Sequence, residues 1–167
     1  MRDRKFKEPT PKSAAERHTI EFTVKTLQIL GKEKIFPKRA RWQGVYEMAR
    51  IVQRVHTCVM FANGIEVESH KLMVDRHEAQ TLALAWMYAL NSKMSLAIDI
   101  FELNANALGD WADKYDEAWR CIKGWRNKDL KRYAAKYGDL TAEETERITN
   151  AARSILDDIM DNSDGLF

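Results

Sequence analysis

Residues that interrupt helices are scarce in this chain. Only 7 of its 167 residues are glycine and only 3 are proline. Two of the prolines, Pro9 and Pro11, fall within the first 13 residues, so Pro37 is the one proline in the remainder. Proline disrupts a helix interior and glycine weakens it. The sequence therefore predicts long helices joined by few loops.

Cysteines and long apolar runs are also scarce. Cys58 and Cys121 lie in apolar helical patterns without C-x-x-C spacing, which favours small buried side chains over metal ligands or a disulfide. No apolar run approaches the roughly 18 residues of a membrane span. The first 12 residues are charged, unlike a secretory signal. These absences predict a soluble cytoplasmic protein with no membrane partner.

Motifs of catalysis and of cofactor binding are lacking. The sequence has no Glu-x-x-His tetrapeptide, which a di-iron bundle needs, and no Gly-rich phosphate loop or nucleophile motif. His77, between Arg76 and Glu78, is interpreted as a surface residue and not as a general base. His56 is interpreted as a core or interface histidine. We predict no enzymatic activity, no cofactor and no metal.

Apolar residues recur in steps of three and four, which predicts helices. The expected helices span approximately 13–34, 38–64, 67–104, 111–137 and 141–161. Ser13 with Glu16, and Thr141 with Glu144, are expected to cap the first and the last of them. The expected core stripe of the first helix is Ile20, Val24, Leu27 and Leu30. That of the second is Val45, Met48, Val52, Val55, Val59 and Ala62, and that of the last is Ile148, Ala152, Ile155 and Ile159.

Short connections between helices force antiparallel neighbours. The predicted fold is therefore all-α, an antiparallel up-down four-helix bundle with an additional C-terminal helix. Three parts are expected along the chain. They are a basic flexible leader over residues 1–13, the four-helix bundle over 14–137, and an acidic helical extension over 138–167.

The net charge of +2 hides a strong asymmetry. Counting Lys and Arg against Asp and Glu, residues 1–41 give 12 − 5 = +7, residues 120–136 give 7 − 1 = +6, and residues 139–167 give 2 − 8 = −6. We expect the start of the second helix and the end of the fourth to share one end of the bundle. Lys38, Arg39 and Arg41 would then join the cations from Arg126 to Arg132 in one composite basic patch.

A patch of this kind suits a nucleic-acid backbone, because cations that neutralise phosphates release counterions. Aromatic residues are interleaved with it and would stack on unpaired bases if exposed. They are Trp42, Trp125, Tyr133 and Tyr137. Two other interpretations stay open. The cations can form an ordinary solvated face, or the acidic extension can fold back on them.

A set of motifs between His18 and Asp129 follows a recognisable order and spacing. It comprises a short apolar first helix, Phe36-Pro37-Lys38-Arg39 with Arg41-Trp42, Arg76 with Gln80, Trp111, and Ile122-x-x-Trp125. This stretch resembles the four-helix bundle family of the accessory variability determinant (Avd) proteins of diversity-generating retroelements. Proteins encoded in ribosomal RNA intervening sequences belong to the same broad group.

The resemblance implies a homopentameric barrel that binds nucleic acid and associates with a reverse transcriptase. In that role the protein is a non-catalytic accessory subunit, and its partners are the polymerase and template RNA or an RNA/DNA hybrid, during mutagenic retrohoming. Carried onto this chain, the resemblance assigns nucleic-acid contacts to Lys38, Arg39, Arg41, Arg50, Arg54, Arg120, Lys123, Arg126 and Lys128. The charge pattern adds Lys131 and Arg132. The alternative is a self-assembling interaction scaffold of a phage or mobile element, without direct nucleic-acid binding.

Overall fold

Five α-helices make up most of the described part of the chain. The structure is a computed structural model that describes residues 13–38, 44–104 and 108–161. Within these ranges the regular secondary structure is helical, apart from turns. The helices are α1 (Ala14–Leu30), α2 (Tyr46–Gly64), α3 (His70–Ile100), α4 (Gly109–Tyr137) and α5 (Ala142–Asp161). The predicted all-α class is confirmed.

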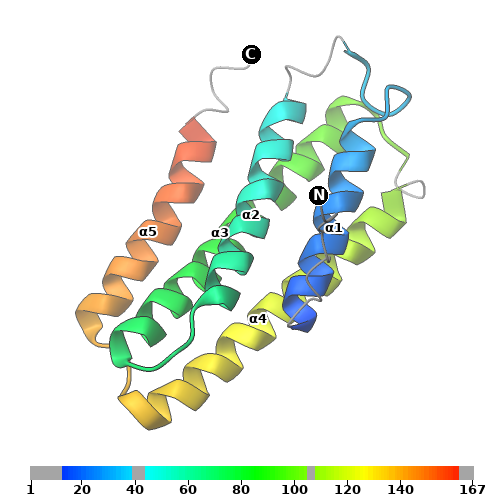
Figure 1. Cartoon of the computed structure of the whole chain (residues 1–167). Coiled ribbons are helices and arrows are strands. Elements are labelled where there is room, and N and C mark those ends of the chain that lie inside the picture. Colours follow the sequence, from blue (N-terminus) through cyan, green and yellow to red (C-terminus); the bar gives the residue numbers. More distant parts are fainter. Residues whose placement is uncertain (1–12, 39–43, 105–107, 162–167) are drawn as a thin grey trace, which may run out of the picture.

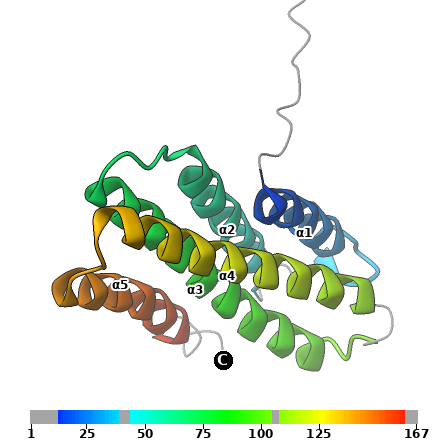
Figure 2. The ribbon, with the colours of Figure 1, turned by 90° about the horizontal axis from the view of Figure 1, so that it is seen from below.

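The first four helices form an up-down bundle, and the fifth packs outside it. α1 and α3 each pack against both α2 and α4, so α2 and α4 are diagonal neighbours. Each helix runs opposite to the one before it (Figure 1). Seen from below the view of Figure 1, α5 lies beside α3 at the edge of the bundle (Figure 2). This confirms the predicted architecture of four helices plus one.

Side-chain contacts show which helix termini meet. At one end of the bundle Phe36, in the α1–α2 connection, packs edge-to-face on Phe101 after α3, with ring centroids 5.3 Å apart. At the other end Tyr137, the last residue of α4, donates a hydrogen bond from its hydroxyl to the carbonyl of Val67, 3.3 Å away. The start of α2 therefore lies with the end of α3, whereas the end of α4 lies with the start of α3.

The first helix buries a different face from the predicted one. The Ser13 hydroxyl accepts the predicted capping bond from the Glu16 amide at 3.1 Å. However, Val24 is 48% exposed and Leu27 is 36% exposed, whereas Leu30 is buried, so the predicted stripe is wrong at Val24 and Leu27. The buried face instead consists of Ala15, Glu16, Thr19, Phe22, Thr23, Thr26, Ile29 and Leu30. Threonine fits this core because its hydroxyl finds local partners, as when Thr19 donates to the Ala15 carbonyl at 2.6 Å.

The second helix buries every residue of its predicted stripe, from Val45 to Ala62. The third helix is packed by α2, α4 and α5, which explains why apolar and small residues occur around most of its circumference. In the fourth helix, Trp111 donates from its indole nitrogen to the Thr26 hydroxyl at 2.9 Å. That buried bond joins the start of α4 to α1.

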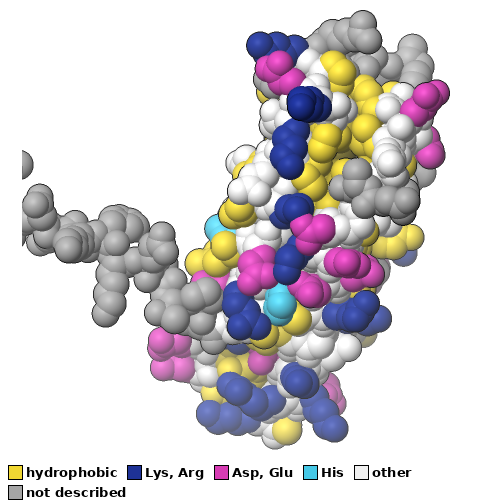
Figure 3. All heavy atoms as spheres, turned by 90° about the vertical axis from the view of Figure 1, so that its right-hand side faces the viewer, with side chains coloured by type: hydrophobic (Ala, Val, Ile, Leu, Met, Phe, Trp, Pro, Cys, Tyr) yellow, Lys and Arg dark blue, Asp and Glu magenta, His cyan; other side chains and the backbone are white. Residues whose placement is uncertain are grey.

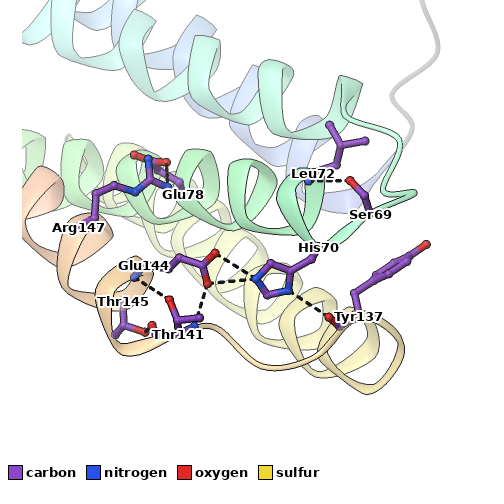
Figure 4. Close-up of polar contacts among 9 residues, drawn as sticks. All are labelled: Ser69, His70, Leu72, Glu78, Tyr137, Thr141, Glu144, Thr145 and Arg147. Atoms are coloured by element: carbon purple, nitrogen blue, oxygen red, sulfur yellow. Dashed lines mark hydrogen bonds and ion pairs between the residues drawn. The ribbon is translucent and has the colours of Figure 1, made fainter.

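The fifth helix has the predicted cap and apolar stripe. Thr141 and Glu144 exchange bonds of 2.8 and 3.1 Å in a capping box, and Ile148 and Ile159 are buried. His70 at the start of α3 contacts the Tyr137 carbonyl and the Glu144 carboxylate, each at 3.1 Å (Figure 4). One imidazole therefore joins α3, the end of α4 and the first turn of α5. Among the described residues, no helix is both long and apolar enough to cross a membrane.

Candidate nucleic-acid interface

The fourth helix carries its charges in two blocks of opposite sign. Residues 109–118 hold one Lys and four acidic residues, 1 − 4 = −3. Residues 119–137 hold seven cations and one acid, 7 − 1 = +6. We call these the acidic half and the basic half of α4. The sign change falls close to the middle of the helix.

Charges of the acidic half are paired with α1. Lys25 on α1 donates to Asp110, and this hydrogen bond holds the pKa of Asp110 below its ordinary value. Lys114 lies 3.1 Å from Glu21 on α1. These ion pairs join two helices, so the acidic half has a structural role at the α1–α4 interface.

The basic half presents most of its cations to solvent. The exposed ones are Arg120, Lys123, Lys128, Lys131, Arg132 and Lys136. Arg120 has a long contact of 3.7 Å to Asp116. Within the described part of the chain, no ion pair is formed by Lys123, Lys128 or Lys131. Lys and Arg side chains gather at the end of the molecule where α4 terminates (Figure 3). This surface carries positive charge that the described residues do not neutralise.

Aromatic rings lie among these cations. Tyr133 and Tyr137 are stacked, with centroids 6.4 Å apart and planes 27° from parallel. The Arg132 guanidinium lies 4.4 Å from the Tyr133 ring and the Lys136 ammonium 4.8 Å from the Tyr137 ring. Both rings are half-buried. Arginine and tyrosine faces at a surface are the groups on which unpaired bases stack.

Arg126 differs from the other cations of the basic half because it turns toward α3. It is half-buried, and burial lowers its pKa. Its positive charge lies near His77, whose pKa is lowered to about 4 by burial and then by Arg126. His77 is therefore a half-buried neutral side chain between α3 and α4, and its interpretation as a surface residue is wrong. Arg126 offers less of its guanidinium to a ligand than its neighbours do.

A buried polar cluster holds the basic half on α3. Arg76 donates from Nε to Asp129 at 2.7 Å, and Gln80 donates to the same oxygen at 3.0 Å. The Arg76 guanidinium also lies 5.0 Å from the Trp125 ring. Asp129 is the single acid of the basic half, and it is 8% exposed. Three residues of the sequence pattern, Arg76, Gln80 and Trp125, thus meet around one carboxylate.

The predicted composite patch does not form among the described residues, because Lys38 and the cations from Arg126 to Arg132 lie at opposite ends of the bundle. Lys38 follows Phe36 at the end where α3 terminates and pairs with Glu33 at 3.1 Å, whereas Arg126 to Arg132 approach the end where α3 begins. Helices α2 and α4 run in the same direction, so the start of α2 lies with the start of α4 (Figure 1). Arg39, Arg41 and Trp42 lie outside the described residues.

The two α2 candidates occupy a third location. Arg50 and Arg54 are exposed on α2, which is diagonal to α4. The Arg54 guanidinium lies 4.9 Å from the Trp86 ring of α3. Among the candidates within the described ranges, the structure therefore brings together those on α4 and no others.

One cation of this surface, Lys136, was missed by the site prediction from sequence. It is exposed and lies four residues after Arg132, which in turn lies four after Lys128. Residues four apart occupy one side of a helix. This spacing is the signal that places Lys136 with the others.

Comparison of the chain with protein-family models, with curated proteins and with solved structures found no match.

Proposed function

We propose that this protein is a non-catalytic nucleic-acid-binding accessory subunit whose binding surface is the basic half of α4. The observation that carries the proposal is the row of exposed cations without ion-pair partners among the described residues, with Lys123, Lys128 and Lys131 as its centre. Cations in such a row neutralise successive phosphates. Lys114, the one cation of the acidic half, and Lys25 of α1 are by contrast paired with carboxylates.

Single-stranded nucleic acid is the proposed form of the ligand. Arg132 and Lys136 lie over Tyr133 and Tyr137 at the end of the row, and stacking on such groups requires bases that are not paired. Contacts to phosphate supply affinity without sequence preference. We infer binding that depends strongly on salt and weakly on sequence.

The resemblance to Avd proteins extends the proposal to a retroelement. It supports a reverse transcriptase and its template RNA as partners, and a homo-oligomer as the working form. A reverse-transcriptase gene with paired template and variable repeats beside this gene would support that extension. A gene neighbourhood without them would contradict it and leave the α4 surface to be tested alone.

Reversing three charges tests the α4 surface. The variant Lys123→Glu, Lys128→Glu, Lys131→Glu is expected to bind a single-stranded RNA oligonucleotide at least about tenfold more weakly. The matched control reverses three exposed cations elsewhere, Lys32→Glu, Lys34→Glu and Arg153→Glu. Its affinity should fall by less than about threefold, because Lys32 and Lys34 lie at the opposite end of the bundle and Arg153 lies on α5.

Fluorescence anisotropy at roughly 50 and 200 mM salt measures both affinity and its salt dependence. Each lost phosphate contact should reduce the slope of log affinity against log salt by about 0.7 for a single strand. Equal losses in the variant and the control would show that only net charge matters. That result would reject the α4 surface as the binding site.

A second candidate function is a self-assembling scaffold, and the exposed apolar side chains of α1 favour it. Val24 and Leu27 lie one turn apart and are exposed, as a helix-to-helix contact between copies would require. Light scattering on the variant Val24→Ser, Leu27→Ser tests this function. A smaller particle than the wild type would support the scaffold, and an unchanged mass would remove α1 as its interface.

A further inference from the structure

A histidine and two glutamates converge where α1 meets the acidic half of α4. His18 Nδ1 lies 3.4 Å from Glu117 Oε2 and 3.8 Å from Glu21 Oε2. The three ligand-type atoms all lie within 4.8 Å of one another. No other group of three such residues in the described ranges is this close.

These spacings match a tetrahedral metal site. Imidazole nitrogen and carboxylate oxygen bind zinc at about 2.0–2.2 Å, so ligand atoms in a tetrahedron lie roughly 3.4 Å apart. The two distances from His18 are within a few tenths of an ångström of that value. The third distance, between the oxygens of Glu21 and Glu117, is at most 4.8 Å. Small rotations of the two glutamate side chains would shorten it.

The helices hold the three side chains in place. His18 and Glu21 are three residues apart and share one side of α1, and Glu117 approaches from α4. The interface next to them is fixed by Phe22 and Tyr115, whose rings pack edge-to-face at 5.6 Å. The site therefore does not depend on ordering a loop.

The Nδ1 atom of His18 is buried although its side chain is 20% exposed, and the two carboxylates reach further into solvent. This nitrogen makes no hydrogen bond within the described part of the chain. The side chains of Glu21 and Glu117 are 41% and 45% exposed. Exposure on that side gives an ion a way in and leaves room for water as the remaining ligand.

Lys114 already occupies the cation position. Its ammonium lies 3.1 Å from Glu21 Oε2 and 3.1 Å from Glu117 Oε2, and hydrogen bonds to Glu117 and then Glu21 raise its pKa. Counting His18 as neutral, His18, Glu21, Glu117 and Lys114 carry 1 − 2 = −1, and the Arg17 guanidinium, 3.4 Å from His18 Nε2, brings the local sum to zero. If the Lys114 ammonium leaves, the two carboxylates present two negative charges that match those of a divalent cation.

We propose that His18, Glu21 and Glu117 bind a divalent transition-metal ion of the Zn²⁺ class in exchange with the ammonium of Lys114. The donor set of one imidazole and two carboxylates suits Zn²⁺ better than Mg²⁺, which prefers oxygen alone. The ion ties α1 to α4 and is independent of the proposed nucleic-acid function. In the sequence, the signal is His18-x-x-Glu21. This order is the reverse of the Glu-x-x-His motif of di-iron bundles.

Isothermal titration of the full chain with ZnCl₂ tests the site. One Zn²⁺ should bind per chain, and His18→Ala and Glu117→Gln should each weaken binding at least about tenfold. Lys114→Met should tighten binding by about tenfold or more, because it removes the competing charge. His56→Ala, which changes a half-buried histidine of α2, should leave the affinity unchanged.

The Lys114 variant separates a metal site from an ordinary ion-pair cluster. Weaker binding in Lys114→Met than in the wild type would overturn the proposal, as would failure of the wild type to bind one Zn²⁺. Unchanged affinity in His18→Ala would overturn it as well. Circular dichroism verifies that each variant is folded. Co²⁺ broadens the His18 ring resonances when it binds at this site. A higher Co²⁺ concentration needed for the same broadening in Glu117→Gln than in the wild type would show a weakened site, even if that variant is less stable.

Discussion

The two halves of α4 show how one helix can carry charges that are paired within the molecule beside charges that face solvent. Lys25 and Lys114 meet Asp110, Glu21 and Glu117 around the acidic half. Most cations of the basic half instead point to solvent. Its one acid, Asp129, forms an ion pair with Arg76. Charge count alone would rank the basic half as the more important one. Pairing shows that the two halves have different roles.

This comparison also shows where stability resides. Exposed ion pairs contribute little, because water and salt screen them. Buried polar contacts matter more, because a group that loses its partner there is not solvated. We therefore expect the largest effects from buried contacts of both halves, and the smallest from the exposed ion pairs.

The largest expected effect comes from Asp129, the acid of the basic half. Asp129→Ala leaves the Arg76 guanidinium buried without its carboxylate, and we expect the free energy of unfolding to fall by about 3 kcal/mol. Urea denaturation measures this loss. Asp116→Ala is the control, since Asp116 is exposed and should change stability by no more than about 0.5 kcal/mol. Equal losses in the two variants would refute the distinction between buried and exposed acids.

A smaller effect is expected at the acidic half, where Trp111 bonds Thr26. Thr26→Val keeps the shape of the side chain and leaves the indole N–H unpaired, which should cost about 1–2 kcal/mol. Thr23→Val is the matched control, because the Thr23 hydroxyl is buried without a hydrogen-bond partner among the described residues. That control should be neutral or stabilising. A destabilisation of equal size in both would mean that the Trp111 bond contributes nothing specific.

The end of the basic half should respond to pH through His70. Its pKa is raised by the hydrogen bond to Glu144 and then by that to the Tyr137 carbonyl. The stabilisation is therefore fully present below the unfolded pKa of about 6.5 and is lost as pH rises through the raised folded value. The thermal midpoint of the wild type should exceed that of His70→Ala at pH 6, and the difference should shrink by pH 8.

His56→Ala is the control for this titration, because no contact from His56 to α5 is present in the described structure. Its difference from the wild type should not follow the same pH profile. An NMR titration of the His70 ring gives the folded pKa directly. A value at or below about 6.5 would contradict the proposal that a protonated His70 stabilises the contact of α3 with α4 and α5.

The smallest effect is expected from the exposed pair of Lys25 and Asp110. Lys25→Met should leave the thermal midpoint nearly unchanged at moderate salt, because the carboxylate remains hydrated. Measuring the midpoint at low and high salt shows whether any difference is electrostatic. A drop as large as that of Thr26→Val would show that the ion pairs, and not the buried contacts, hold the acidic half.

Much of the fold could be predicted because most helices have one apolar side. The stripes of α2 and α5 are buried as expected, since valine and isoleucine on those helices have no competing apolar face. The predicted apolar face of α1 was wrong at Val24 and Leu27, which lie outside the core. Thr19 and Thr26 are buried in their place, because their hydroxyls form hydrogen bonds there. Hydropathy alone cannot reveal a threonine that has found a partner.

The order of charges along one helix could be predicted from the sequence, whereas the arrangement of the candidates in space could not. The row from Arg120 to Arg132 could be read from spacing along one helix. The proposed meeting of Lys38 with Arg126 required the direction of two helices, and counting alternate directions correctly would have separated them. The Arg76–Asp129 contact and the His18 cluster depend on which helix faces which, and that information is contained in tertiary packing.

The order of charges along α4 also affects how a ligand arrives. A negative block followed by a positive block gives α4 an electric dipole along its axis, with the same sense as the charges that stabilise helix termini. A polyanion approaching within roughly one Debye length, about 8 Å at physiological salt, would experience a torque before any contact forms. Such orientation raises the rate of productive encounter more than the final affinity. On the proposed function, the acidic half would turn an incoming strand toward the end of the bundle where the cations lie.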